Sequence, residues 1–153
     1  RKRMDLSEFK YKVWDNTRKI GELMNTILNR WGSEYGLSAL QLRILMELHQ
    51  NGPQTVGGLA GSVLISGANI STMCKKLESM GFVVRNRDSS DERVVLIALS
   101  EKGGQIIKTI DRYYEEAIAS EMGEDGEKNL EAIICGMEKI NELLHLLADD
   151  NDD

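Results

Sequence analysis

Several features common in membrane and secreted proteins are missing from this 153-residue chain. It has no apolar run near the roughly 18 residues that a bilayer-spanning helix needs. Its basic start is not followed by the apolar core of a secretory signal. The two cysteines, Cys74 and Cys135, lie far apart in the sequence, which argues against a disulfide framework and for a reducing environment. We therefore expect a cytoplasmic protein with no membrane partner.

Patterns typical of enzymes and metal sites are missing as well. His49 and His145 have no second histidine or cysteine at ligand spacing, so no metal site is expected. We find no nucleophile paired with a base, no glycine loop suited to phosphate and no paired catalytic acids. We expect no enzyme activity and no cofactor. Cys74 and Cys135 are interpreted as packing residues, with a redox role as the alternative.

Charge is distributed unevenly along the chain, whose formal net charge is −6. Residues 1–36 hold 8 Lys and Arg against 5 Asp and Glu, and residues 37–103 hold 7 against 6. Residues 104–153 hold 4 against 14 and end in a solvated acidic tail at residues 150–153. An acidic protein can still present a local DNA-binding face, with modest and salt-sensitive affinity for random DNA.

Hydrophobic periodicity predicts a mainly α protein with a small β-hairpin wing. Caps and breakers set the expected bounds, with Ser38, Thr55, Ser66 and Ser100 opening helices and the single proline, Pro53, breaking the chain. The expected helices cover residues 6–34, 38–51, 55–63, 66–80 and 100–118, and a last one follows a break at residues 123–126. One expected strand begins at residue 82, and a second runs from residue 94 to residue 99.

The segment from residue 66 to residue 99 carries the most specific pattern. A helix, an apolar strand, a charged turn and a second strand are the layout of a winged helix-turn-helix, which places one helix in the DNA major groove and the hairpin tip against the minor groove or backbone. Helical spacing turns Ile70, Met73, Cys74 and Leu77 toward the core. The alternative is an ordinary surface helix. The outward residues expected to contact DNA are Ser66, Gly67, Ala68, Asn69, Ser71, Thr72, Lys75 and Lys76.

The charged turn of the hairpin mixes arginines with acids. Acids would weaken a loop that only binds phosphate, but Asp91 can brace Arg93 across the turn and reduce its rotamer freedom. The alternative is a solvated charged turn without function. The residues of this wing expected to act in DNA binding are Arg85, Arg87, Asp91 and Arg93.

This part of the chain is similar to the MarR-type transcriptional regulators. The residues that carry the resemblance are Leu59-Ala60, Ser66 to Glu78, Gly81-Phe82-Val83, the set Arg85, Asp88, Asp91, Glu92 and Arg93, and Leu99 to Gly103. The resemblance implies a dimeric winged-helix repressor or activator, in which Arg93 enters the minor groove and Asp91 holds it there. The chain departs from the family pattern at Gly57, Gly58 and Gly67, where better helix formers are usual.

We expect three parts: a winged helix-turn-helix DNA-binding domain at residues 37–103, a helical dimerisation region formed by residues 1–36 with residues 104–149, and the acidic tail. The first and last helices have apolar stripes that a small winged-helix core does not need, so they should bury against each other and a second copy. The alternative is a larger monomeric bundle. The stripe of the last helix comprises Ile133, Ile134, Met137, Ile140, Leu144 and Leu147.

The sequence therefore predicts a homodimeric regulator that binds a pseudo-palindromic site in double-stranded DNA, most simply a repressor that responds to a ligand or signal. The alternative is a winged-helix module for protein contact without DNA binding. The resemblance also implies a small aromatic or phenolic effector. Trp31, Tyr35, Met46 and His49 lie near the helix ends that would line its site, and the alternative is that they are core residues.

Overall fold

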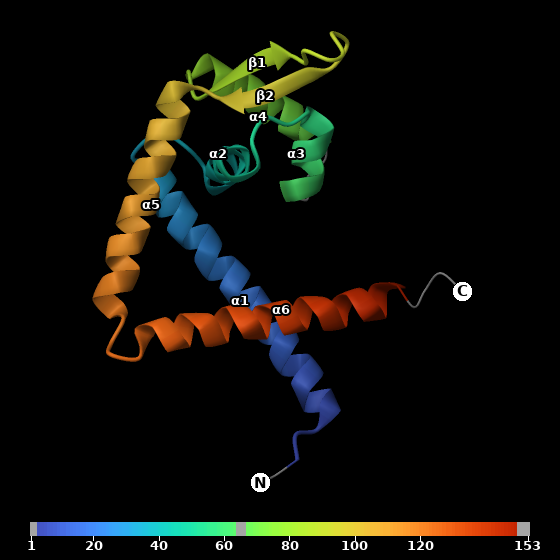
Figure 1. Cartoon of the computed structure of the whole chain (residues 1–153), viewed down its shortest axis with the longest axis vertical. Helices are drawn as coiled ribbons and strands as arrows, with labels where there is room; N and C mark the ends of the chain where they lie inside the picture. Colours follow the sequence, from blue (N-terminus) through green and yellow to red (C-terminus); the bar gives the residue numbers. More distant parts are fainter. Residues whose placement is uncertain (1–2, 64–66, 150–153) are drawn as a thin grey trace. The chain divides into compact units, whose positions relative to one another are not determined.

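The computed structural model describes residues 3–63 and 67–149. They form helices and one two-stranded antiparallel sheet, as the sequence predicts (Figure 1). The elements are α1 (Leu6–Ser33), α2 (Ala39–Asn51), α3 (Val56–Val63), α4 (Gly67–Ser79), β1 (Val83–Arg87), β2 (Val95–Leu99), α5 (Glu101–Glu121) and α6 (Gly126–Asp149). Among the helices of these ranges, none is long and apolar enough to cross a membrane. The predicted contact Ser66 and the tail at residues 150–153 lie outside the described residues.

Local caps set the ends of the helices that lead into the winged region. Ser38 and Gln41 form a reciprocal capping box at the start of α2, with N–O distances of 3.2 and 2.9 Å. Gly52 ends α2 with a φ of 77°, in the left-handed region that favours glycine. Thr55 then caps α3, because its Oγ1 accepts from the Gly58 N–H at 3.1 Å. The capping roles predicted for Ser38 and Thr55 are confirmed.

The hairpin is joined to the loop that precedes α3. β1 and β2 pair antiparallel, with Val83 opposite Leu99. On the other edge of β2, the Gln54 N–H donates to the Ile97 carbonyl at 3.0 Å, and the Ile97 N–H donates to the Gln54 carbonyl at 2.7 Å. The wing is therefore attached to the helical part by backbone hydrogen bonds as well as by side-chain packing.

The described part of the chain divides into two compact units, one that ends at Ile110 and one that begins at Asp111. The first unit contains one apolar core, to which Leu28 of α1 and Ile110 of α5 also contribute. Its largest fully buried side chains are Leu42, Ile44, Leu45, Leu59, Ile70, Leu77, Ile97 and Ile107. This unit extends past residues 37 and 103, the limits expected for the DNA-binding domain. The division into DNA-binding and dimerisation parts stays a prediction.

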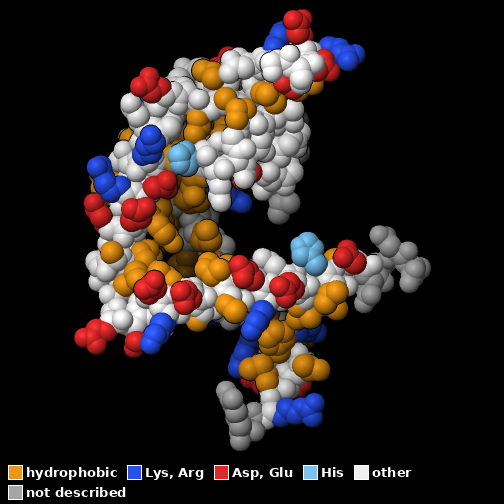
Figure 2. Space-filling view, viewed as in Figure 1, with side chains coloured by type: hydrophobic (Ala, Val, Ile, Leu, Met, Phe, Trp, Pro, Cys, Tyr) orange, Lys and Arg blue, Asp and Glu red, His pale blue; other side chains and the backbone are white. Residues whose placement is uncertain are grey.

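Helices α1 and α6 leave most of their apolar side chains uncovered (Figure 2). In α1 only Leu28 and Gly32 are buried, and in α6 only Gly126. The exposed apolar residues of α1 include Leu6, Phe9, Trp14, Ile20, Leu23, Met24 and Ile27. Those of α6 include Ile133, Ile134, Met137, Leu144 and Leu147, whereas Ile140 is half-buried. Exposed apolar surface of this extent is typical of interaction sites.

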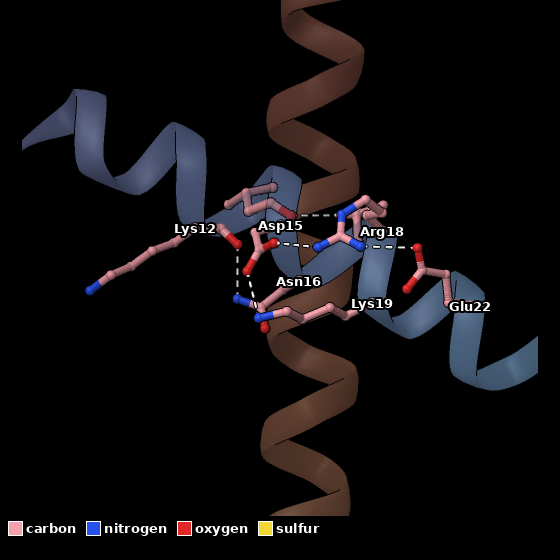
Figure 3. Close-up of polar contacts among 8 residues, drawn as sticks. Lys12, Asp15, Asn16, Arg18, Lys19 and Glu22 are labelled. Atoms are coloured by element: carbon pink, nitrogen blue, oxygen red, sulfur yellow. Dashed lines mark hydrogen bonds and ion pairs between the residues drawn. The ribbon is translucent and has the colours of Figure 1, made fainter.

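Ion pairs between successive turns support the part of α1 that has no core beneath it (Figure 3). Asp15 pairs with Lys19 at 2.7 Å and with Arg18 at 2.8 Å, and Arg18 pairs with Glu22 at 2.9 Å. The hydrogen bonds from Lys19 and Arg18 lower the pKa of the Asp15 carboxyl. Each exposed pair contributes little, but several at i,i+3 and i,i+4 spacing favour the helix.

Candidate nucleic-acid interface

Helix α4 separates an apolar face from a polar face. Ile70, Cys74 and Leu77 have no exposed surface, and Met73 is half-buried against the same core. The described polar face consists of the exposed residues Gly67, Asn69, Thr72, Lys75 and Lys76 and the half-buried Ser71. The division of faces predicted from the sequence is therefore confirmed for the described side chains. Those of Ser66 and Ala68 are not among them.

The end of α4 delivers the chain directly into the wing. The Phe82 N–H donates to the Leu77 carbonyl at 3.0 Å, and the Gly81 N–H donates to the Glu78 carbonyl at 3.0 Å. Gly81 has a φ of 82°, which costs little only for glycine. This turn confirms Gly81 as the terminator and allows β1 to begin two residues later. The wing therefore follows α4 without a flexible linker.

Asp91 holds Arg93 at the tip of the wing. Its Oδ1 accepts from the Arg93 N–H at 3.0 Å and from Nε at 3.1 Å, and its Oδ2 accepts from Nη2 at 3.3 Å. These hydrogen bonds from Arg93 lower the pKa of the Asp91 carboxyl. The Arg93 side chain is nevertheless 91% exposed. Its guanidinium is thus oriented while remaining open to a ligand, and the predicted contact between the two residues is present.

Further hydrogen bonds close the loop that carries this pair. Arg87 Nη1 donates to the Glu92 carbonyl at 2.6 Å, and the Asp88 N–H donates to the Val94 carbonyl at 2.9 Å. Basic and acidic side chains lie together at the tip of the hairpin (Figure 2). Arg87 supports the loop through this contact, and its contact with DNA stays a prediction.

Two contacts of this region are not foreseen from the sequence. Arg85 Nε lies 2.7 Å from Glu78 Oε2, so a wing arginine expected to contact DNA is paired with the last turn of α4. Glu47 of α2 accepts from Asn51 at 2.7 Å and from Gln54 at 3.3 Å. These hydrogen bonds lower the pKa of the Glu47 carboxyl. The Arg85–Glu78 and Glu47–Gln54 contacts each join a helix to a residue outside that helix. Helical periodicity does not reveal contacts of this kind.

The four residues expected near an effector separate into two kinds. Trp31 and Tyr35, from α1 and the turn after it, are half-buried and pack against the core. Met46 lies on α2 and is exposed, as is His49 on the same helix. The aromatic pair fits the alternative interpretation as core residues, and the effector site stays a prediction. Across residues 3–63 and 67–149 no group of three or more His, Cys, Asp or Glu is arranged to hold a metal ion.

Comparisons with known proteins agree with this geometry. Residues 26–110 match the family model described as transcriptional regulator SarA/Rot. The regulator FarR of Neisseria gonorrhoeae is 32% identical over 111 residues, which are 71% of this chain and 68% of FarR. The uncharacterised HTH-type regulator YkoM of Bacillus subtilis is 31% identical over 81 residues, and the match spans 53% of each chain. The chain thus spans about half the length of YkoM.

A solved structure shares the fold over nearly the whole chain. A MarR family protein from Bacillus stearothermophilus superimposes with a TM-score of 0.76 at 20% sequence identity, covering 94% of this chain and 99% of that one. At this identity the likeness shows the fold. The mainly α winged-helix architecture predicted from the sequence is confirmed, and it is the fold of this MarR family protein.

Proposed function

This chain belongs to the SarA/Rot family of transcriptional regulators, which are not enzymes, and from that membership we propose that it binds duplex DNA as a homodimer. The polar face of α4 enters the major groove, where Asn69, Ser71 and Thr72 meet base edges and Lys75 and Lys76 meet phosphates. Arg93 reaches into the neighbouring minor groove. We call α4 and the wing of one protomer its reading head. The two reading heads of the dimer recognise the two halves of a pseudo-palindromic site.

The observation that carries this proposal is the arrangement of Asp91 and Arg93. An arginine on an exposed loop ordinarily loses rotamer freedom when it binds, and this loss weakens the contact. The three hydrogen bonds from Arg93 to Asp91 hold the side chain before DNA arrives. A solvated turn without function has no need for a braced guanidinium that is 91% exposed. The polar face of α4 lies in the same compact unit and supplies the base-reading partner.

The uncovered stripes of α1 and α6 support the homodimer. Ile133, Ile134 and Met137 are each about half exposed, at 56, 56 and 47%. A monomeric bundle would bury these side chains within its own chain, whereas a two-fold dimer buries them against the partner copy. The dimer would also set the distance between the two reading heads. We propose that the DNA-bound dimer represses transcription. A small aromatic or phenolic effector that changes this distance would release the DNA and so relieve the repression.

DNA binding is tested by titrating the protein into a mixed-sequence duplex and into a duplex selected from fragments of the source genome, at several salt concentrations. We expect the affinity to fall steeply with salt, and footprints of the selected duplex to show two half-sites about 10 base pairs apart. Binding that is absent or independent of salt would overturn the proposal and favour a winged-helix module for protein contact.

The dimer is tested by analytical ultracentrifugation at micromolar concentration. Ile140→Asp should dissociate the dimer, because it would bury an unpaired charge in the interface. Cys135→Asp is the matched control, since helical spacing places Cys135 away from the stripe and its side chain is exposed. A monomeric parent, or equal dissociation by both variants, would contradict the proposed interface.

A further inference from the structure

The turn after α4 is held by the first residues of α5. The Ser100 Oγ donates to the Gly81 carbonyl at 2.5 Å, and the Ser100 N–H donates to the Phe82 carbonyl at 3.0 Å. Ser100 also caps α5, since its Oγ accepts from the Gly103 N–H at 3.0 Å. One serine therefore connects the end of the predicted recognition helix to the start of the next helix. We call residues 80–82 together with residues 100–103 the α4–α5 joint.

Lys102 makes a second set of contacts in this joint. Its Nζ donates to the Met80 carbonyl at 3.0 Å and lies 4.6 Å from the centre of the Phe82 ring. Met80 directly follows the last residue of α4, where carbonyls lack helical partners. A cation at this end of a helix also interacts favourably with the helix dipole. Lys102 is thus used as a cap on α4, although it belongs to α5.

The joint is packed too closely to slide. Gly103 is buried, and a Cβ added to it would overlap the Phe82 carbonyl oxygen and lie 3.1 Å from Leu99 Cδ2. Such an overlap is not tolerated, so the backbone of α5 directly contacts the turn after α4. By contrast, nothing lies within 4 Å of a Cβ at the neighbouring Gly104. The close approach is therefore specific to the side of α5 that faces the turn after α4.

We propose that Lys102 is a positioning residue that fixes the angle of α4 for base reading and does not itself bind DNA. This inference rests on the proposed DNA binding. Asn69 lies 11 residues before Met80, about 16 Å along a helix, so a tilt of about 5° at the joint would move it by about 1.4 Å. Hydrogen bonds to base edges do not survive such a shift. Lysine contacts with phosphate depend less on position, because the ammonium is a point charge on a flexible stem.

The test compares Lys102→Met with Lys108→Met on the selected duplex and on a random duplex, at several salt concentrations. Methionine keeps an apolar stem near the Phe82 ring but removes the charge and the donor. Lys108 is an exposed lysine of the same helix, so its substitution controls for net charge. We expect Lys102→Met to lower the affinity for the selected duplex about tenfold and the affinity for the random duplex less than about twofold. A tenfold loss corresponds to part of the discrimination that one good base contact provides. The slope of log K against log salt should be the same for Lys102→Met and Lys108→Met. Lys102→Arg should bind both duplexes with the affinity of the parent.

Three results would overturn this role. Equal losses on both duplexes with a salt slope reduced by about one unit would make Lys102 a phosphate contact. Unchanged binding to both duplexes would mean that the cap does not set the angle of α4. An unchanged ratio of the two affinities together with a lower melting temperature would make the contact merely structural. Ser100→Ala should shift the same ratio in the same direction if the joint acts as a unit. Failure of the parent to bind either duplex would instead overturn the proposed function, and this inference with it.

Discussion

The Glu78 carboxylate lies 2.7 Å from Nε of Arg85, which joins the last turn of α4 to the first strand of the wing. The two side chains are 46 and 31% exposed, so water screens the pair and its contribution to stability is small, about 0–1 kcal/mol. We expect its effect on DNA binding to be larger. Glu78 neutralises an arginine of the wing and so reduces the positive charge that α4 and the wing present to a phosphate backbone.

Glu78→Gln should therefore tighten binding to random duplex DNA. It frees Arg85 to meet a phosphate, so the slope of log K against log salt should steepen by up to about one unit. Glu34→Gln removes the same charge at an exposed position just after α1 and serves as the control. If anisotropy titrations give both variants the same affinity and the same slope, Arg85 does not face the DNA.

Arg93→Ala should weaken binding to the selected duplex by about 1–3 kcal/mol, the range of a specific groove contact. Asp91→Ala should cause a smaller loss in the same direction, because it removes only the brace, and Ser89→Ala in the same loop should bind like the parent. Since the pKa of Asp91 is lowered by Arg93, the brace is complete above the ordinary aspartate pKa and is lost only as the pH falls through the lowered value. Titrations between pH 5 and 8 should therefore show no dependence on the protonation of Asp91.

The parts of the fold that the sequence predicts are those with local causes. Ser38 caps α2 through a residue three positions later, and Gly81 ends α4 because the turn requires a positive φ. The two faces of α4 follow from helical spacing alone. Asp91 and Arg93 are two residues apart, so their contact is also visible in the sequence. Each of these features is decided within about one turn of chain.

The parts that the sequence does not predict depend on where elements meet. The Arg85–Glu78 pair and the Lys102–Met80 hydrogen bond join different elements, the latter across 22 residues. Periodicity also shows which face of a long helix is apolar. It does not show which turns of that face are buried by the rest of the same chain. For this reason the sequence places Leu28 of α1 in a dimerisation region, although it is buried in the core shared with α2 to α5.

Replacing two glycines of the first unit by alanine should change the stability of the fold in opposite directions. Gly61 lies within α3, and a Cβ added there would have nothing within 4 Å, so Gly61→Ala should stabilise the fold by about 0.5–1 kcal/mol. Gly103→Ala should destabilise it by about 1–3 kcal/mol or more, because the new Cβ would meet the Phe82 carbonyl oxygen. Urea unfolding at one protein concentration measures both. A loss of stability for Gly61→Ala would mean that this face of α3 is covered.

The two thiols should differ in reactivity. Cys74 is fully buried and burial raises the pKa of its thiol, so it has little thiolate and no access for a reagent. Cys135 is exposed on α6. Iodoacetamide should alkylate Cys135 in the native protein and Cys74 only after unfolding, as read by peptide mass spectrometry. Cys135→Ser should take up no label when native, and rapid labelling of Cys74 would show that α4 is not packed against the core.

The polar face of α4 offers a way to separate base reading from phosphate neutralisation. Asn69 is exposed near the start of the helix, where recognition helices contact base edges, and Lys75 is exposed further along it. Asn69→Ala should therefore lower affinity for the selected duplex much more than for random duplex. Lys75→Ala should weaken both alike and reduce the salt slope by about one unit. Each variant acts as the control for the other, because both truncate an exposed side chain of the same helix. Equal losses on the two duplexes for Asn69→Ala would mean that a different face of α4 lies in the groove.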